Sequence, residues 1–262
     1  MIEISKTMYI PLFGKALVSQ KGVILSDKKA EEIWKKECFP IKGKAKSKYL
    51  AFYMAMRARV FDEWTKEKLS AHPDAVVLHI GCGMDSRVLR VGACENLWYD
   101  VDFEDVIEER KRYFSESSTY FMLSGDVSKA DWLSKIPKNK PAIVVMEGVS
   151  MYLTPEENRA LLERLTKHFS SVHLLMDAYT ALSAKFTRIA NPVKNVGVLK
   201  TYGIDEPETL ESNCVVFKKE HDMTPKTLIN ELTGIEKHIF QKLYAGRFSK
   251  KLYRMYEFAG GV

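Results

Sequence analysis

The stretch VVLHIGCGMDSR, residues 76–87, decides the fold class of this chain of 262 residues. It opens with an apolar run that one histidine interrupts, and such a run is typical of a strand buried on both faces of a sheet. Gly81 and Gly83 follow directly, and a helical pattern begins near Asp85. A strand, a glycine turn and a helix in this order indicate a parallel α/β sheet, in which ligands bind beyond the carboxyl ends of the strands.

Strand and helix patterns alternate along the chain after this stretch. The segments with strand character are residues 75–81, 96–102, 118–126, 141–149, 171–179, 214–220 and 252–260. Helical patterns cover residues 103–114, 129–136 and 154–169, and another helix begins near Thr224. Thr154 and Glu157 form a capping box at the start of the third of these helices. The alternation predicts a mostly parallel sheet of seven strands with helices on both faces.

We expect the whole chain, residues 1–262, to form one domain around this sheet. Residues 71–180 make up its core. Residues 1–70 are mostly helical and are expected to cover one end of the sheet. Residues 181–213 read as a helical insertion opposite this cap, and residues 214–262 add the last strands and a helix.

Composition and charge exclude several classes of protein. No apolar run approaches the roughly 20 residues of a membrane span, and the N-terminus lacks the features of a signal peptide. The four cysteines and six histidines are scattered without metal-binding spacing, so we expect a cytoplasmic protein without a metal and without membrane contact. Residues 1–70 hold 15 basic against 8 acidic residues, a balance of +7 within a net charge of +6. Solvated surface lysines explain this excess most simply, and a positive rim for an anionic substrate or RNA is the alternative.

Acidic residues close three of the expected strands at one edge of the sheet. Asp102 ends the second strand, 21 residues after Gly81, while Asp126 and Glu147 end the third and fourth. A carboxylate at the end of the second strand commonly binds the ribose hydroxyls of a nucleoside, although Asp102 could instead cap the helix that follows. Like charges gathered at one edge destabilise a fold unless a cation lies among them.

The glycine turn disfavours a dinucleotide. The pyrophosphate-binding pattern requires a third glycine where this chain has Ser86, and Asp85 would place negative charge beside the phosphates. A nucleoside without phosphates that carries a cationic group suits the turn better. S-adenosylmethionine, with its sulfonium and ammonium groups, is the compound we expect. A nicotinamide-dependent oxidoreductase is the alternative from another class of enzyme.

Arg57 lies at the centre of an apolar helix face in the stretch KYLAFYMAMRARVFDEW, residues 48–64. At about 100° per residue, six apolar residues surround its direction. These are Leu50, Tyr53, Met54, Val60, Phe61 and Trp64. A buried guanidinium needs an anionic partner. We expect it to bind the carboxylate of the cofactor bidentately, with an ion pair to Asp62 or Glu147 as the structural alternative.

Several segments together resemble the leucine carboxyl methyltransferase family, in particular its bacterial polyketide-type O-methyltransferases. They run in the family's order from residue 6 to about residue 180, and YGIDEPETL follows. They are TMYIPLFGKAL, MRARVFDEW, VVLHIGCGMDSRVLR, WYDVDFEDVIEERK and MEGVSMYLTPEE. The resemblance implies the Rossmann-like fold of class I methyltransferases, with S-adenosylmethionine as the cofactor.

The resemblance also implies roles for single residues. Arg57 would bind the carboxylate of the cofactor, Gly81 the methionine moiety, Asp102 the ribose, Asp126 with Val127 the adenine, and Glu147 would lie near the ammonium group. The cofactor-binding residues that we expect are Lys15, Arg57, Gly81, Gly83, Asp102, Asp126, Val127 and Glu147.

The expected reaction is methyl transfer to an oxygen of a small-molecule, polyketide-like acceptor, with residues 181–213 on the acceptor side. A carboxylate acceptor is ionised at pH 7 and needs no general base, whereas a phenol would need one. Tyr152 and Arg87 are expected to face the mouth of the active site, where either could orient the acceptor. An alternative acceptor is a carboxyl group on tRNA or on a protein C-terminus. An alternative function is that of a cofactor-binding protein without catalytic activity. Nucleic acid is the less favoured partner, because the lysines are spread over many helical turns.

Overall fold

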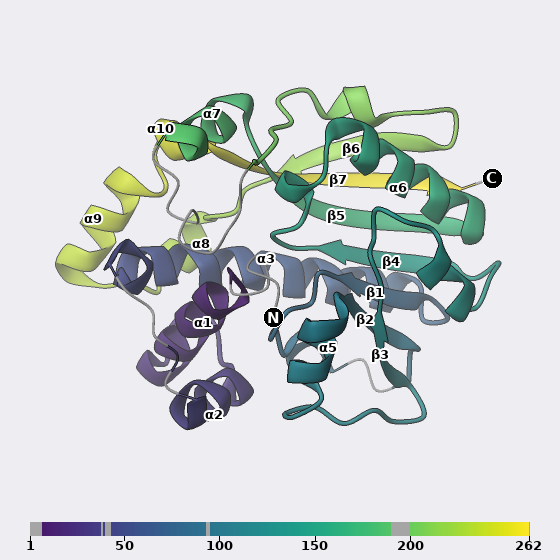
Figure 1. Cartoon of the computed structure of the whole chain (residues 1–262). Coiled ribbons are helices and arrows are strands. Elements are labelled where there is room, and N and C mark those ends of the chain that lie inside the picture. Colours follow the sequence, from purple (N-terminus) through teal and green to yellow (C-terminus); the bar gives the residue numbers. More distant parts are fainter. Residues whose placement is uncertain (1–6, 38, 40–42, 93–94, 190–199, 262) are drawn as a thin grey trace.

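The computed structural model describes residues 7–37, 39, 43–92, 95–189 and 200–261. A seven-stranded sheet with the order β3-β2-β1-β4-β5-β7-β6 lies at its centre (Figure 1). The first five strands run parallel, and β7 is antiparallel to both of its neighbours. The strands are β1 (Val76–Ile80), β2 (Trp98–Asp102), β3 (Tyr120–Ser124), β4 (Pro141–Met146), β5 (Ser171–Tyr179), β6 (Val215–His221) and β7 (Tyr253–Gly261). The predicted fold class is therefore confirmed.

The described helices precede, connect and follow these strands. They are α1 (Tyr9–Lys21), α2 (Lys28–Glu37), α3 (Lys48–Ala71), α4 (Arg87–Val91), α5 (Glu104–Arg110), α6 (Pro155–His168), α7 (Ala181–Ile189), α8 (Lys226–Ile229), α9 (Gly234–Leu243) and α10 (Arg247–Lys250). The predicted capping box of α6 is present, because Thr154 Oγ1 accepts from the Glu157 amide at 3.1 Å and Glu157 Oε2 accepts from the Thr154 amide at 2.7 Å. Among the described helices, none has the apolar length that crossing a lipid bilayer requires.

Some local predictions were wrong. Residues 129–136 contain a 3₁₀ helix, Asp131–Lys135, and α4 begins at Arg87, two residues after Asp85. The helix expected from Thr224 is three pieces, α8 to α10. Gly234, with a φ of +54°, begins α9, and Gly246 directly precedes α10. The positive φ of Gly234 favours a break there, because glycine adopts conformations that other residues resist.

Apolar layers cover both faces of the sheet, which explains why β1 is buried along its whole length. Val77 faces the layer that contains α3, whereas Val76 and Leu78 face the layer that contains α6. In Figure 1, α6 lies in front of the sheet and α3 runs behind it. Within residues 1–70, which the sequence predicts to cover one end of the sheet, α3 also packs against one face of it (Figure 1). This helix of 24 residues buries side chains between Ala51 and Thr65, whereas residues 66–71 are not buried.

The order of the strands fixes where a ligand can bind. The chain passes from β1 to β2 on one side, and β4 then pairs with β1 on the other, so the switch point lies between β1 and β4. Ligands of open α/β sheets bind at the carboxyl ends of the strands at this point. Both α1 and α7 lie near this end, on opposite sides of the sheet in Figure 1. The insertion predicted at 181–213 begins with α7 and includes a 3₁₀ helix, Pro207–Leu210, while residues 190–199 lie outside the described residues.

Candidate active site

A cavity of about 630 Å³ opens at the switch point of the sheet. Its volume is typical of sites for small ligands. Its walls come from α1, α3, the turn after β1, and the segments that follow β2, β3, β4 and β5. All of the residues predicted to bind the cofactor line it, as does Tyr152; they are Lys15, Arg57, Gly81, Gly83, Asp102, Asp126, Val127 and Glu147. The structure thus brings together residues from distant parts of the chain.

The turn after β1 lets the main chain reach the cavity wall. Gly81 has a φ of +65°, and a Cβ atom there would lie 2.2 Å from Val149 Cγ2. Gly83 has a φ of +49°, and its amide donates to Asp102 Oδ2 at 2.8 Å. Positive φ values favour glycine, and the clash at Gly81 excludes any side chain. The two glycines expose backbone groups where a side chain would fill the cavity.

Asp102 is held at the cavity wall by two main-chain amides. Its Oδ2 accepts from Gly83, and its Oδ1 accepts from Phe103 at 2.8 Å. The N-cap residue of α5 is Phe103, so the alternative that Asp102 caps this helix is wrong. Burial raises the pKa of Asp102 to about 6, because the hydrogen bonds from the amides only partly offset the loss of water. This carboxylate therefore titrates near neutral pH.

The loop after β3 lies beside Asp102 at the same edge. Asp126 follows the end of β3 by two residues, and its Oδ1 accepts from the amide and the hydroxyl of Ser128 at 3.0 and 2.7 Å. The carbonyl of Val127 accepts from Arg164 at 2.7 Å. These bonds hold the loop in one conformation at the cavity wall.

Arg57 is buried, with 3% of its surface exposed, and pairs with two acids. Its Nε and Nη2 donate to Glu147 Oε1 at 3.1 and 2.8 Å. Its Nη1 donates to Asp177 Oδ2 at 2.8 Å and to the Tyr253 hydroxyl at 2.7 Å. Of the five N–H groups of a guanidinium, these contacts leave one unengaged by the described residues. The ion pair with Glu147, named as the structural alternative, is present, and Arg57 has one further N–H and its charge to offer a cofactor carboxylate.

Arg87 lies away from the cavity, contrary to the prediction from the sequence. It is fully buried and does not line the cavity, so the prediction that it faces the mouth is wrong. Its Nε donates to Asp62 Oδ1 at 2.8 Å, its Nη1 lies 3.1 Å from His79 Nε2, and its Nη2 bonds Glu147. Because α3 crosses behind the sheet, Asp62 comes within reach of α4 and draws the guanidinium inward.

Lys15 and Asp85 form a second buried pair at the cavity wall. Lys15 bonds the Asp85 carboxylate, and its Nζ lies 4.0 Å from Glu147 Oε1. Arg90 donates to the other Asp85 oxygen at 2.7 Å. The charge of Asp85 is thus compensated by its neighbours. Of the two arguments against a dinucleotide, only the missing third glycine therefore remains.

The ions in this region form one network with an excess of negative charge. Four cations and five anions participate, and Asp102 adds a further carboxylate nearby. The cations are Lys15, Arg57, Arg87 and Arg90, and the anions are Asp27, Asp62, Asp85, Glu147 and Asp177. A compound with a sulfonium, an ammonium and a carboxylate carries a net charge of +1. The cavity therefore fits S-adenosylmethionine both in charge and in the close approach that the glycine turn allows.

Three functional residues of the cavity region were not predicted from the sequence. Asp177 is fully buried within β5, where its Oδ1 accepts from the Gly148 amide at 2.7 Å and its Oδ2 from the Tyr253 hydroxyl at 2.6 Å. Tyr179 and Tyr253 line the cavity and face each other across β5 and β7. A carboxylate in the apolar run SVHLLMDAY was a signal for Asp177, since a buried acid needs partners. The tyrosines carried no such signal.

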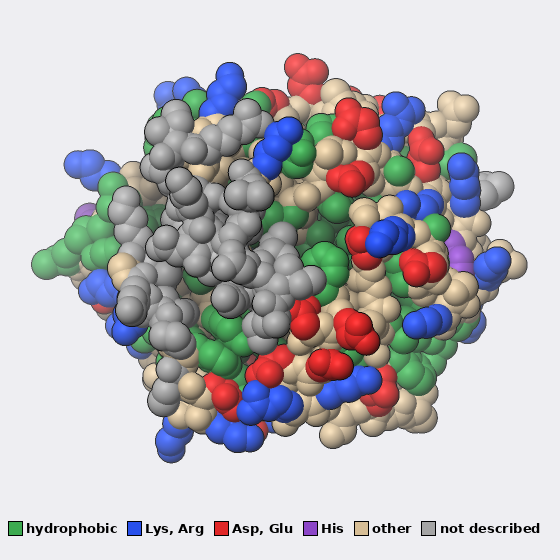
Figure 2. Space-filling view, viewed as in Figure 1, with side chains coloured by type: hydrophobic (Ala, Val, Ile, Leu, Met, Phe, Trp, Pro, Cys, Tyr) green, Lys and Arg blue, Asp and Glu red, His purple; other side chains and the backbone are tan. Residues whose placement is uncertain are grey.

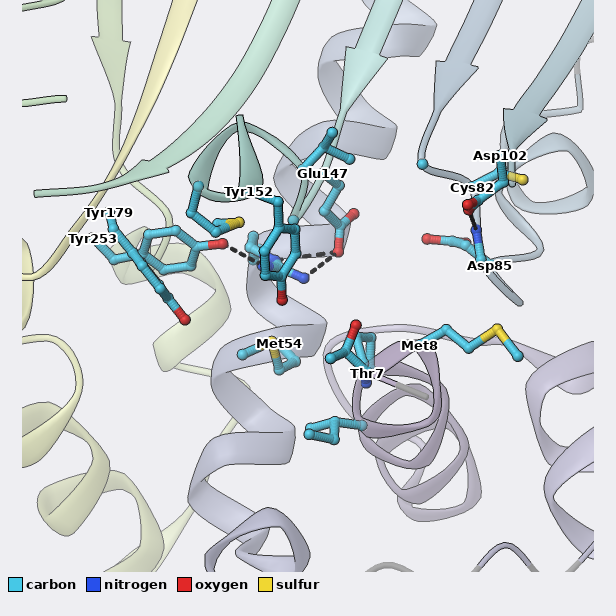
Figure 3. A pocket seen from close by; sticks show the side chains of 18 of the residues that line it. Thr7, Met8, Met54, Cys82, Asp85, Asp102, Glu147, Tyr152, Tyr179 and Tyr253 are labelled. Carbon is cyan, nitrogen blue, oxygen red and sulfur yellow. Dashed lines mark hydrogen bonds and ion pairs between the residues drawn. The ribbon is translucent and has the colours of Figure 1, made fainter. Parts of the chain in front are cut away.

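Two halves of the cavity differ in chemistry. In Figure 3, Asp85 and Asp102 lie on one side of Glu147, while Tyr152, Tyr179 and Tyr253 lie on the other. The tyrosine side is completed by apolar residues of α3, of α9 and α10, and of the turn before β7. These are Leu50, Met54, Leu243, Phe248 and Leu252. One half thus presents charge, and the other presents aromatic and aliphatic surface with hydroxyl groups.

Comparisons with known proteins identify the family of this chain. The family model described as leucine carboxyl methyltransferase matches residues 9–166. The tetracenomycin polyketide synthesis O-methyltransferase TcmP of Streptomyces glaucescens is 31% identical over 258 residues, which cover 96% of each chain. The S-adenosyl-L-methionine-dependent methyltransferase dpfgK of Gibberella zeae is 32% identical over 192 residues, which are 68% of this chain and 64% of that protein.

A solved structure has the same fold at low sequence identity. It is the magnesium protoporphyrin IX methyltransferase of Synechocystis PCC 6803 with bound SAM, with a TM-score of 0.51 and 13% identity over 88% of this chain and 91% of that one. The family model covers more than half of the sequence, and the Streptomyces protein matches nearly all of it. This protein therefore belongs to the leucine carboxyl methyltransferase family.

Proposed function

We propose that this protein transfers a methyl group from S-adenosylmethionine to the carboxylate of a largely apolar small molecule. Its family makes it a methyltransferase, and the nicotinamide-dependent alternative is thereby excluded. The observation that carries the proposal is the buried network of four cations and five anions that meets a glycine turn at the cavity. S-adenosylmethionine, when bound, supplies an electrophilic methyl group on its sulfonium.

The residues of the charged half would hold the cofactor along its length. Asp102 accepts hydrogen bonds from ribose hydroxyls, and the loop of Asp126 and Val127 meets the adenine. Glu147 neutralises the ammonium group, while Arg57 attracts the carboxylate with its charge and its remaining N–H. Arg87 bonds the Glu147 carboxylate from the side that faces away from the cavity, and so holds it in place without lining the cavity itself.

The acceptor half favours a substrate that is already ionised. Burial raises the pKa values of Tyr53, Tyr152, Tyr179 and Tyr253 above those of ordinary phenols, so they stay protonated and serve as donors. Both ring nitrogens of His79 have partners, Asp100 and Arg87, and burial lowers its pKa. The three tyrosines Tyr152, Tyr179 and Tyr253 and the five apolar residues named with them include no acid and no histidine. A carboxylate needs no base, whereas an alcohol would.

The surface gives less support to a nucleic-acid substrate. Figure 2 shows basic and acidic side chains interspersed on the face that it presents, and apolar side chains at its left edge, over α9. Binding of a polyanion depends on a continuous basic surface and weakens steeply with salt. We therefore favour a small molecule over tRNA. Measurable RNA binding with a steep salt dependence would contradict this preference.

Calorimetry with S-adenosylmethionine tests the proposed function. We expect Arg57→Lys and Asp102→Asn to weaken binding about 10-fold to 100-fold, because lysine lacks the guanidinium fork and asparagine lacks the charge. Arg59→Lys is the matched control: Arg59 is on the same helix but exposed, and pairs with Glu63 at 2.7 Å. Unchanged affinity in both cavity variants would overturn the proposal.

A further inference from the structure

Tyr179 differs from Tyr53, Tyr152 and Tyr253 in its hydrogen bonds, while Tyr244, which also lines the cavity, packs its ring against Tyr49, Tyr53 and Phe240. The Tyr253 hydroxyl bonds Arg57 and Asp177, the Tyr152 hydroxyl bonds Thr7, and the Tyr53 hydroxyl lies 4.0 Å from Met223 Sδ. The Tyr179 hydroxyl lines the cavity and makes no hydrogen bond to any residue within the described ranges. At the wall of an open cavity this hydroxyl is available to a ligand, and a phenylalanine in its place could not donate a hydrogen bond.

The position of Tyr179 relates it to the charged half of the cavity. It follows Asp177 by two residues in β5, so both side chains lie on the same face of the sheet. Its ring lies 5.1 Å from the ring of Tyr253, which bonds Arg57. In Figure 3, the hydroxyls of Tyr152 and Tyr179 point the same way, toward the space above Met54. The Tyr179 hydroxyl therefore borders the network that would hold the cofactor.

An apolar path leads from this donor to the surface. Leu243 and Phe248 line the cavity, yet they are 58% and 62% exposed, so they form its rim. Ser183, at the start of α7, completes this side. A molecule with its polar group at Tyr179 would lay its apolar part along Met54 and these rim residues.

We propose that Tyr179 is a specificity-determining residue that donates a hydrogen bond to the acceptor carboxylate, and that the acceptor is amphipathic, with one carboxylate on an apolar body. This inference rests on the proposed function. The acceptor oxygen forms a new bond to the methyl carbon as the sulfur–carbon bond breaks, the electron pair of that bond goes to sulfur, and no proton moves. The anionic acceptor thereby becomes a neutral ester. Because a hydrogen bond to an anion is about twice as strong as one to a neutral group, Tyr179 would favour the substrate over the product.

A binding experiment with two probes tests this role. The probes are 2-naphthoate and its methyl ester, titrated by fluorescence into the protein saturated with S-adenosylhomocysteine. We expect the wild type to bind the carboxylate about tenfold more tightly than the ester. We expect Tyr179→Phe to abolish most of this ratio while its affinity for the ester and for S-adenosylhomocysteine stays within about twofold.

Tyr49→Phe is the matched control, since it removes a phenolic hydroxyl from α3 outside the cavity wall. It should keep the wild-type ratio. An unchanged ratio in Tyr179→Phe, or equal binding of both probes to the wild type, would overturn the role of Tyr179 while leaving the proposed function intact. Failure of the wild type to bind S-adenosylmethionine would instead overturn the proposed function, and this inference with it.

Discussion

The charged half and the acceptor half of the cavity are built on different principles. In the charged half, buried ions from α1, α3, α4, β4 and β5 hold one another, as Arg57 does with Glu147 and Asp177. In the acceptor half, aromatic and aliphatic side chains form a wall whose rim is exposed. Removing one buried ion leaves its partners unpaired where water cannot solvate them. Substituting an exposed apolar side chain changes the free energy of unfolding little. Substitutions in the charged half should therefore be poorly tolerated, whereas the residues of the acceptor half can change to suit the acceptor.

Of the variants that test this difference between the two halves, Arg87→Ala should have the largest effect on stability. It leaves Asp62 and Glu147 without their buried guanidinium, and we expect the free energy of unfolding to fall by about 3–5 kcal/mol. Urea denaturation measures the loss. Arg112→Ala is the control: the side chain is 51% exposed and pairs with Glu109 at 2.7 Å, so its removal should leave the free energy of unfolding nearly unchanged. An equal loss of stability in the two variants would contradict the idea that the buried ions of the charged half stabilise one another.

A somewhat smaller effect is expected from Gly81→Ala. The added methyl group meets Val149 at 2.2 Å and a φ of +65°, so we expect a loss of about 3 kcal/mol and weaker cofactor binding. Gly22→Ala shares the backbone strain, with a φ of +67°, but no atom lies within 4 Å of its Cβ. It should cost only about 1 kcal/mol. Thermal denaturation measures the loss of stability, and calorimetry measures cofactor binding. Similar losses of stability in the two variants would show that the contact with Val149 adds nothing to the backbone strain.

The third prediction concerns pH. The pKa of Asp102 is raised to about 6, so its ionised form is lost as the pH falls through that value. Affinity for S-adenosylmethionine should be level above pH 7 and fall about tenfold, or about 1.4 kcal/mol, per unit below pH 6. The folded chain holds this proton more tightly than the unfolded chain does, so ionisation of Asp102 lowers stability as the pH rises from about 4 to about 6. Asp102→Asn should bind weakly with a flat profile; a sloping profile in this variant would assign the titration to another group.

The smallest effects should come from the acceptor rim. We expect Phe248→Ala and Leu243→Ala to change the free energy of unfolding by less than about 0.5 kcal/mol, because both side chains are mostly exposed. Binding of 2-naphthoate and its ester should weaken alike, by about 2-fold to 5-fold, as apolar contact is lost. Ile235→Ala is the control, since Ile235 is 77% exposed on α9 and does not line the cavity. A loss confined to the carboxylate would show that the rim senses charge.

Much of the charged half could be predicted from short stretches of sequence. The glycines after β1 and the acids after β2 to β4 occupy positions that strand periodicity identifies, and Arg57 is conspicuous on an apolar helix face. Arg87 was placed wrongly because its partner Asp62 lies 25 residues away on a helix whose path behind the sheet no local pattern reveals. Tyr179 and Tyr253 were missed because a tyrosine in a strand is equally consistent with packing.

By itself the sequence determined the order of strands and helices, the turn that allows close approach, and the acids at one edge, since these follow from periodicity and from the backbone preferences of neighbouring residues. Only the tertiary structure decided which ions pair, which hydroxyl is left for a ligand, and where the cavity opens. Arg57 bonds Asp177 and Tyr253 at separations of 120 and 196 residues. Such contacts depend on distances that arise only when α3 packs against the sheet, because electrostatic and hydrogen-bond energies act over a few ångströms in space regardless of separation along the chain.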